Sequence, residues 1–289
     1  MKTIPFMNLR YHAYLASLLL MTISLFSLYY KGLNLGLDFT GGSVIELKFE
    51  KGTSIPQVRK TLEELGYSHF QVQDTAGGSI LIKLRLGDSP DRALEGLKRL
   101  SPYEVVRSET IGGVITSELR QKAIWAIVVA IGGILLYLGY RFEALWALGA
   151  VLALLHDVLL VVGAYSLTQR EVNLDVVAAL LIVAGYSVSD TVVVFDRIRE
   201  NLRLRKGTAL REVIDLSINQ TLARTIMTSL TTLAVSITLF LFGGPALSNI
   251  TFAFVVGVVV GTFSSIFVAS AVVLDIKSRL KDRPTQTVV

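Results

Sequence analysis

Long apolar runs alternate with short polar segments along most of the chain. The hydrocarbon core of a bilayer requires roughly 20 apolar residues in a helix that crosses it. Six windows meet this length: residues 13–31, 120–140, 144–167, 173–196, 223–242 and 248–275. The last window is longer than one crossing needs, so we expect it to tilt or to extend past the membrane. The pattern predicts a polytopic α-helical membrane protein with six transmembrane helices.

Residues 32–118, between the first two windows, have a different character. Strand-like alternation and helical spacing follow one another in this segment, at Ser43–Phe49, Ile55–Gly66, Phe70–Asp74, Ser79–Leu86, Asp88–Leu100 and Tyr103–Ile111. The order is strand, helix, strand, strand, helix, strand, which is the split β-α-β pattern of ferredoxin-like α+β domains. We therefore expect one small α+β domain between the first and second membrane helices.

Basic residues gather on one side of the predicted membrane. Most of the Lys and Arg that lie near spans are Lys2 and Arg10 at the start of the N-terminal tail and first helix (residues 1–31), Arg141, and those of the segment 197–221 and the tail 276–289. Because such residues concentrate in cytoplasmic loops, both termini are expected in the cytoplasm and residues 32–118 outside it. The first window is followed by no small-residue cleavage site, so it is interpreted as an uncleaved span. The apolar positions of 197–221 alternate loosely with charge, which predicts an amphipathic helix lying at the cytoplasmic surface.

Composition narrows the possible functions. The chain has 289 residues, of which 52% are hydrophobic, and a mean hydropathy of +0.58. Cysteine is absent and only three His are present, so a zinc site is not expected. The net charge of +5 comes from residues beside spans, which argues against nucleic-acid binding. No phosphate loop, dinucleotide fingerprint or hydrolase motif occurs, so we expect neither an enzyme nor a bound cofactor.

Two opposite charges stand in or beside neighbouring spans. Asp190 lies inside the window 173–196, and Arg224 lies at the start of 223–242. A charge at the bilayer centre costs about 2.5–3.5 kcal/mol, so such residues face protein or water and commonly mark an ion path. Both residues fall in the cytoplasmic third of their spans, where contact between them is geometrically possible.

These two residues suggest a proton path. Burial opposes ionisation of the Asp190 carboxyl group, whereas a nearby guanidinium favours it, so a modest conformational change can move the proton. Ser187 shares the helix face of Asp190, and Thr228 shares that of Arg224. The alternative interpretation is a static salt bridge that fixes the register of two helices.

A second polar position lies deep in the third window. Asp157 there would extend the polar network that contains Asp190 and Arg224. Its neighbour His156 is expected to project in another direction and to be a packed polar residue.

Four motifs resemble the SecD/SecF family of protein-export subunits, and three of them follow the SecF pattern and order. They are GLDFTGGS (Gly36–Ser43), LLHDVLL (Leu154–Leu160), GYSVSDTVVVFDRIREN (Gly185–Asn201) and ARTIMTSLTTL (Ala223–Leu233). The resemblance implies one RND-type half, an auxiliary role beside the SecYEG channel and use of the proton-motive force to draw preproteins across the cytoplasmic (inner) membrane of a prokaryote. It implies SecD as a separate chain, surrounding membrane lipid, and Asp190 and Arg224 as proton-path residues. Sodium stays open as the coupling ion.

The first motif contains a short signature of Asp38, Phe39, Thr40, Gly41 and Gly42. The two glycines could act as a hinge that passes motion to the α+β domain, or they could form an ordinary turn that enters a strand. For Asp38 and Thr40 a local turn motif is expected rather than contact with a ligand. A small-molecule efflux subunit and a non-conducting translocon scaffold remain as alternative functions.

Overall fold

The computed structural model describes residues 4–281 except Lys51, His69 and Ala76. The chain divides into two compact units, of which one comprises Met1–Asn34 and Ala126–Val289 and the other comprises Leu35–Trp125. The second unit extends beyond the expected limit at residue 118 because its last turns belong to a helix that continues unbroken to Arg141.

Long helices form the first unit. Within the described residues, six helical segments are long and apolar enough to cross a membrane, which confirms the expected number. They are α1 (Arg10–Tyr30), α5 (Gly113–Arg141), α6 (Ala144–Thr168), α7 (Leu174–Leu204), α8 (Leu210–Phe242) and the pair α9 (Gly244–Phe267) and α10 (Ala269–Lys281). The short elements η1 (Phe6–Asn8), β1 (Asn34–Leu35) and β6 (Glu171–Val172) lie beside the ends of these helices.

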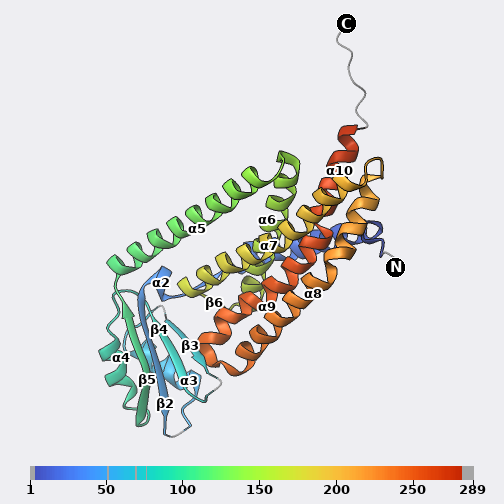
Figure 1. Ribbon diagram of the computed structural model, residues 1–289. Coiled ribbons are helices and arrows are strands. Elements are labelled where there is room, and N and C mark those ends of the chain that lie inside the picture. Colours follow the sequence, from blue (N-terminus) through green and yellow to red (C-terminus); the bar gives the residue numbers. More distant parts are fainter. Residues whose placement is uncertain (1–3, 51, 69, 76, 282–289) are drawn as a thin grey trace. The chain divides into compact units, whose positions relative to one another are not determined.

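Close helix packing in this unit depends on small residues. Helix α9 packs against both α7 and α8, and α6 packs against α1 and α9 (Figure 1). A Cβ added at Gly163 of α6 would lie 2.3 Å from the Cβ of Ser24 of α1, and one added at Gly257 of α9 would lie 2.3 Å from a methyl group of Val183. Glycine at these positions lets the helix backbones approach closely.

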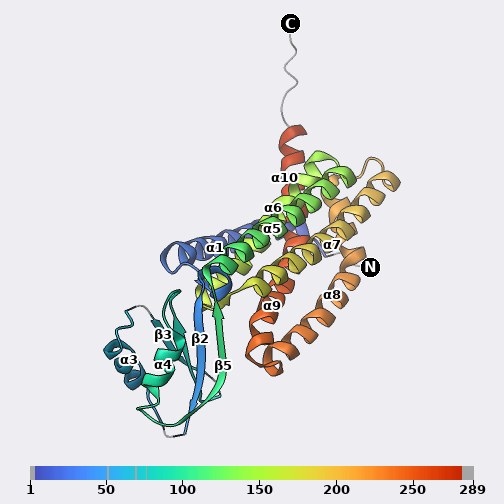
Figure 2. The ribbon, with the colours of Figure 1, turned by 90° about the vertical axis from the view of Figure 1, so that its left-hand side faces the viewer.

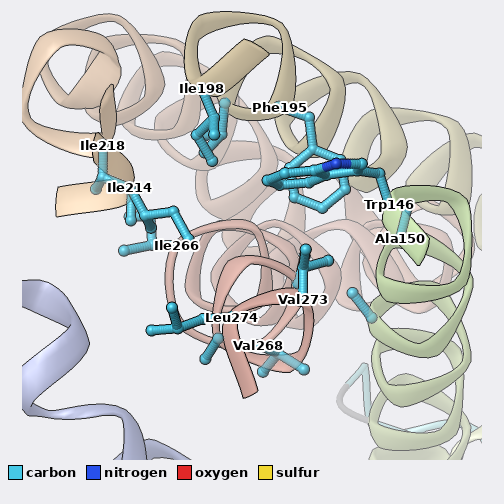
Figure 3. Packing of buried hydrophobic residues seen from close by; sticks show 14 of the residues in the cluster. Trp146, Ala150, Phe195, Ile198, Ile214, Ile218, Ile266, Val268, Val273 and Leu274 are labelled. Atoms are coloured by element: carbon cyan, nitrogen blue, oxygen red, sulfur yellow. The ribbon is translucent and has the colours of Figure 1, made fainter. Parts of the chain in front are cut away.

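An apolar core joins helices α5, α6, α7, α8, α9 and α10 near the end of α7. Phe195 of α7 makes edge-to-face contacts with Phe142 and Trp146, at ring-centroid distances of 5.7 and 5.0 Å. Ile214 and Ile218 of α8 and Val273 of α10 extend the same cluster (Figure 3). Aromatic pairs in this geometry add about 0.5–1.5 kcal/mol beyond the area that they bury.

The expected surface helix over residues 197–221 is wrong. The segment belongs to two long helices, since α7 continues to Leu204 and α8 begins at Leu210. Val213, Ile214 and Ile218 are fully buried in the core rather than laid on a membrane surface. A helix that buries its apolar face against protein has the same periodicity as one that buries it in lipid, so the sequence pattern alone did not separate them.

The sixth window contains a break. Helix α9 ends at Phe267 and α10 begins at Ala269, with Val268 between them. The extra length of this window is thus divided between two helices that meet at Val268, whose side chain belongs to the core shown in Figure 3.

The second unit contains a four-stranded antiparallel sheet in the order β3-β4-β2-β5. Its elements follow the predicted order of strand, helix, strand, strand, helix, strand (Figure 2). They are β2 (Gly42–Phe49), α3 (Ile55–Glu64), β3 (Phe70–Asp74), β4 (Ile80–Leu84), α4 (Pro90–Leu97) and β5 (Tyr103–Ile111), preceded by the short α2 (Leu37–Thr40). Ser54 and Gln57 form a capping box at the start of α3, and Ser89 caps α4.

The core of this unit lies between one face of the sheet and both helices. Ile45 and Leu47 of β2 are two residues apart, Ile82 of β4 is paired with Ile45, and all three are fully buried. They pack against Val58 and Leu62 of α3 and against Ala93 and Leu97 of α4. One sheet face is thereby covered by helices, as the alternating pattern requires.

Candidate functional site in the membrane helices

Asp157 of α6 is the centre of a buried polar network. Its Oδ2 accepts hydrogen bonds from Ser187 Oγ of α7 and, at 2.6 Å, from Ser264 Oγ of α9. Its Oδ1 lies 2.8 Å from His156 Nδ1, and His156 Nε2 lies 3.1 Å from Ser17 Oγ of α1. All five side chains are buried. Four helices therefore meet at one carboxyl group whose two oxygens both have partners.

Asp157 was expected to extend the network of Asp190 and Arg224, but its hydrogen bonds go to His156, Ser187 and Ser264. The arrangement also corrects the interpretation of His156. The imidazole was expected to project away from Asp157, but the two side chains are in contact. Neighbouring Cα–Cβ bonds diverge on a helix, yet the Nδ1 edge of a His side chain is long enough to reach back to an adjacent carboxylate. Ser17 and Ser264 were missed, because each is one of several Ser and Thr residues in its apolar window and no local signal distinguishes it from the others.

Asp190 of α7 lies one helical turn beyond Ser187, in a different environment. Its side chain is half-buried. Its Oδ2 is a buried atom that has no hydrogen-bond partner among the described residues. Buried carboxylate oxygens are normally hydrogen-bonded, so an unpaired one marks a position that a proton or another polar group can engage.

The contact between Asp190 and Arg224, which their positions in the sequence allow, is not present. Among the described residues, the ion pairs within 4.0 Å do not include these two side chains. The guanidinium acts on Asp190 through its electrostatic field from a greater distance. The cause is the rotation of α8, which buries Thr225 and Ser229 and leaves Arg224 exposed on the neighbouring stripe.

Helices α7 and α8 are joined instead through hydroxyl groups. Tyr186 Oη donates to Ser229 Oγ at 3.1 Å, and Ser229 Oγ lies 2.7 Å from Thr262 Oγ1 of α9. Because α7 and α8 are antiparallel, one turn onward from Tyr186 brings Asp190 to the level of Thr225, one turn before Ser229. Thr225 Oγ1 is also a buried atom without a hydrogen-bond partner in the described part of the chain. Two unpaired buried oxygens thus lie at the same level of adjacent helices.

Thr228 does not reach this level of the helix interface. Its hydroxyl donates to the carbonyl groups of Arg224 and Thr225 in its own helix, and its side chain is exposed. The structure therefore places Thr228 beside Arg224 on the outward stripe of α8, away from the Asp157 network.

The signature residues lie at the start of the α+β unit. Asp38 and Phe39 belong to α2, and Thr40 Oγ1 donates to Gly36 O at 3.0 Å, which is a local turn contact. Gly41 and Gly42 both have positive φ angles, of 67° and 115°. A Cβ on Gly42 would lie 2.3 Å from Leu84 O, so the backbone of β2 can enter the sheet here only with glycine. This geometry is that of a tight strand entry.

Two family models match the chain. Residues 93–279 match "Protein export membrane protein SecD/SecF, C-terminal", and residues 26–53 match "SecD/SecF GG Motif". The chain is 42% identical to the protein translocase subunit SecF of Calditerrivibrio nitroreducens over 281 residues, which cover 93% of this chain and 92% of that protein. It is 40% identical to the protein translocase subunit SecF of Haemophilus influenzae over 280 residues, covering 95% and 86% of the two chains.

A longer relative contains a region similar to the whole of this chain. The protein translocase subunit SecDF of Thermus thermophilus is 42% identical over 278 residues, which are 92% of this chain and 37% of that protein. The crystal structure of SecDF, a translocon-associated membrane protein from the same organism, matches with a TM-score of 0.88 at 39% identity. The match covers 96% of this chain and 39% of that one, so this chain spans about two fifths of the fused protein.

Proposed function

Since the chain belongs to the SecD/SecF family of protein-export membrane proteins and is a SecF subunit by its near-full-length relatives, we propose that it converts the proton-motive force into protein export through Asp190. Its role lies in Sec-associated protein export, and SecD is its partner. The SecYEG channel and the exported preprotein complete the assembly in which it works. The observation that carries the proposal is the unpaired, buried Oδ2 of Asp190 within a membrane helix.

Asp190 is suited to take up and release a proton. An ionised carboxylate in this position is attracted by Arg224, whose guanidinium keeps its charge at all physiological pH values. A protonated carboxyl group loses that attraction and can instead donate a hydrogen bond to a neighbouring hydroxyl group such as that of Thr225. The two states of Asp190 therefore favour different distances between α7 and the outward stripe of α8.

The hydrogen bonds of Asp157 hold α7 against α6 and α9 while Asp190 changes its protonation state. Ser187 joins α7 to α6 and α9 one turn from Asp190, through the carboxyl group of Asp157. A rearrangement at Asp190 is then transmitted along α7 relative to a rigid joint rather than lost in local side-chain motion. The coupling ion in this proposal is the proton, because one neutral and one ionised state of a single carboxyl group are sufficient for the cycle.

The proposed orientation places both termini in the cytoplasm and the α+β unit outside it. Six crossings put the N-terminal end of α1 and the end of α10 on one side of the membrane. The helix ends on that side carry Arg141, Arg197 and Arg203, as the positive-inside rule favours.

The test measures export in inverted membrane vesicles that contain this chain, SecD and SecYEG, with and without an imposed proton gradient. We expect Asp190→Asn to reduce the stimulation of export by the proton gradient at least tenfold. Co-purification of the variant with SecD should be retained. Asp175→Asn provides the matched control, because Asp175 is an exposed residue in the first turn of the same helix. Stimulation by a proton gradient that persists in Asp190→Asn would support a scaffold without ion flux, and stimulation by a sodium gradient alone would identify sodium as the coupling ion.

A further inference from the structure

Helices α5 and α7 line two open hollows that follow one another along the same pair of helices. The first is an apolar slot of about 460 Å³, lined on α5 by residues such as Ala130 and Gly133 and on α7 by Gly185 and Val188. The second is a polar hollow of about 450 Å³, which Arg141 of α5 and Arg199 and Arg203 of α7 line together with Asp196, Glu200 and Leu204.

The two hollows are adjacent. Tyr137 lines the slot and Arg141 the polar hollow, one turn apart on α5. Val192 and Asp196 have the same relation on α7. Residues four apart lie on one helix face, so the slot and the polar hollow follow one another along both helices.

The polar hollow carries an excess of positive charge. Arg141 pairs with Asp196 at 2.7 Å, and Glu200 is engaged by Arg197 at 2.6 Å. Both acidic side chains of the hollow are thus neutralised. Arg199 contacts only a backbone carbonyl group, that of Arg141 at 3.5 Å, and Arg203 has no acidic partner within 4.0 Å among the described residues. Two guanidinium groups, one helical turn apart, therefore remain for an anion.

Together, the apolar slot and the polar hollow match a phospholipid molecule in length and in polarity. From Val129 to Arg141 the two hollows extend about 18 Å along α5 at 1.5 Å per residue, close to the roughly 15 Å of one hydrocarbon leaflet. The slot is open along one side and lined mainly by apolar and small residues, so an acyl chain can lie along it between α5 and α7.

We propose that α5 and α7 bind one anionic phospholipid, with an acyl chain in the slot beside Gly133 and the phosphate between Arg199 and Arg203. Guanidinium groups form bidentate hydrogen bonds to phosphate oxygens, and basic hollows between membrane helices recognise anionic headgroups. The lipid belongs to the leaflet on the side of Arg141, and it fills the space beside α5, the least buried of the six described membrane helices.

The experiment is native mass spectrometry of the full chain in detergent with added phosphatidylglycerol or phosphatidylcholine. We expect wild-type protein to prefer phosphatidylglycerol by at least tenfold. Arg199→Gln with Arg203→Gln should lower phosphatidylglycerol binding about 25-fold, since each basic residue near a headgroup contributes about 1 kcal/mol. Arg205→Gln with Lys206→Gln removes the same charge from the loop after α7 and should leave the preference intact.

A second pair of variants tests the slot independently of charge. A Cβ at either Gly132 or Gly133 meets no atom within 4 Å, but only Gly133 lines the slot. Gly133→Leu should abolish lipid binding, and Gly132→Leu should preserve it. Thermal unfolding of each variant establishes that it is folded.

Three outcomes would overturn the proposal. An equal loss of phosphatidylglycerol binding in the two charge variants would show that the lipid is attracted by basic charge in general and not by Arg199 and Arg203. Displacement of phosphatidylglycerol by inorganic phosphate at equal concentration would identify a site for a free anion, with no role for the slot. Expulsion of the lipid on addition of SecD would identify the slot as the seat of a partner helix.

Discussion

The two sides of the helical unit differ in how completely they are packed. Half of the apolar stretch of α6 is buried, as is half of that of α9 with α10, whereas 11% is buried in α5 and 17% in α8. Helix α7 lies between the well-packed side formed by α6, α9 and α10, called the closed side, and the side of α5 and α8, called the open side. Its Ser187 contacts Asp157 of α6 on the closed side, and its own acid, Asp190, lies toward the open side.

Asp157 and Asp190 show how a structural carboxyl group differs from one that can take up and release a proton. Asp157 has hydrogen-bond partners from three other residues, so any change of its protonation or position breaks several contacts at once. Asp190 has a buried oxygen without a partner. A proton or a partner group can bind there without breaking an existing bond.

The largest stability effect is expected at Asp157. Asp157→Asn replaces an acceptor oxygen by an amide donor in front of Ser187, Ser264 or His156, and should lower the free energy of unfolding by about 2–4 kcal/mol. Asp190→Asn should lower it by less than about 1 kcal/mol, because no hydrogen bond to Oδ2 is lost. Thermal and denaturant unfolding of the detergent-solubilised chain compares them directly. Similar losses in the two variants would remove the distinction drawn between these acids.

A glycine pair tests the packing difference without charge. Gly163→Ala on the closed side drives a methyl group into Ser24, whose Cα lies 2.9 Å from the new Cβ, and should cost about 1–3 kcal/mol. Gly139→Ala on α5 meets no atom within 4 Å and should stabilise the helix by up to about 1 kcal/mol. Melting temperatures of the two variants should therefore move in opposite directions. A loss at Gly139 as large as that at Gly163 would mean that α5 packs as closely as α6.

A serine pair measures a single bond of the closed side. Ser264→Ala removes the 2.6 Å hydrogen bond to Asp157 and should cost about 1–2 kcal/mol. Ser265→Ala is the matched control, since its hydroxyl bonds to a backbone carbonyl group in its own helix and its loss should cost less than about 0.5 kcal/mol. Equal unfolding curves for the two variants would show that the hydrogen bond from Ser264 to Asp157 does not contribute to stability.

Periodicity was sufficient for much of the fold. The six apolar windows of the sequence correspond to six helical membrane segments among the described residues. The pattern of apolar positions between Ser43 and Ile111 predicted the order of strands and helices correctly. The segment 197–221 failed because an apolar helix face does not reveal whether protein or lipid covers it. The Asp190–Arg224 contact is absent for a different reason. The rotation of α8 about its axis is set by all of its buried hydroxyl and apolar contacts together, and one charged residue does not determine it.

The buried network could be foreseen only in part. A lone Asp157 in an apolar window requires polar partners, and this much follows from the cost of burying a charge. Which serines supply the hydrogen bonds depends on where α1 and α9 cross α6, and no local pattern around Ser17 or Ser264 encodes those crossings. Ser187 was identified because it shares a helix face with Asp190, although its bond is to Asp157.

The smallest effect is expected on the open side, at Arg224. Its side chain is exposed, and its interaction with Asp190 acts across more than 4.0 Å, so Arg224→Ala should change the unfolding free energy of the isolated chain by less than about 0.5 kcal/mol. The same variant measured in the complex with SecD separates two roles. A guanidinium that faces only lipid headgroups or water gives the same small value in both settings. A guanidinium that becomes enclosed when SecD binds gives a larger loss in the complex, because removing one member of a desolvated charge pair leaves the other uncompensated. A loss above about 1 kcal/mol in the isolated chain would instead show that the side chain is already held within it, and that the open side is more closed than its burial indicates.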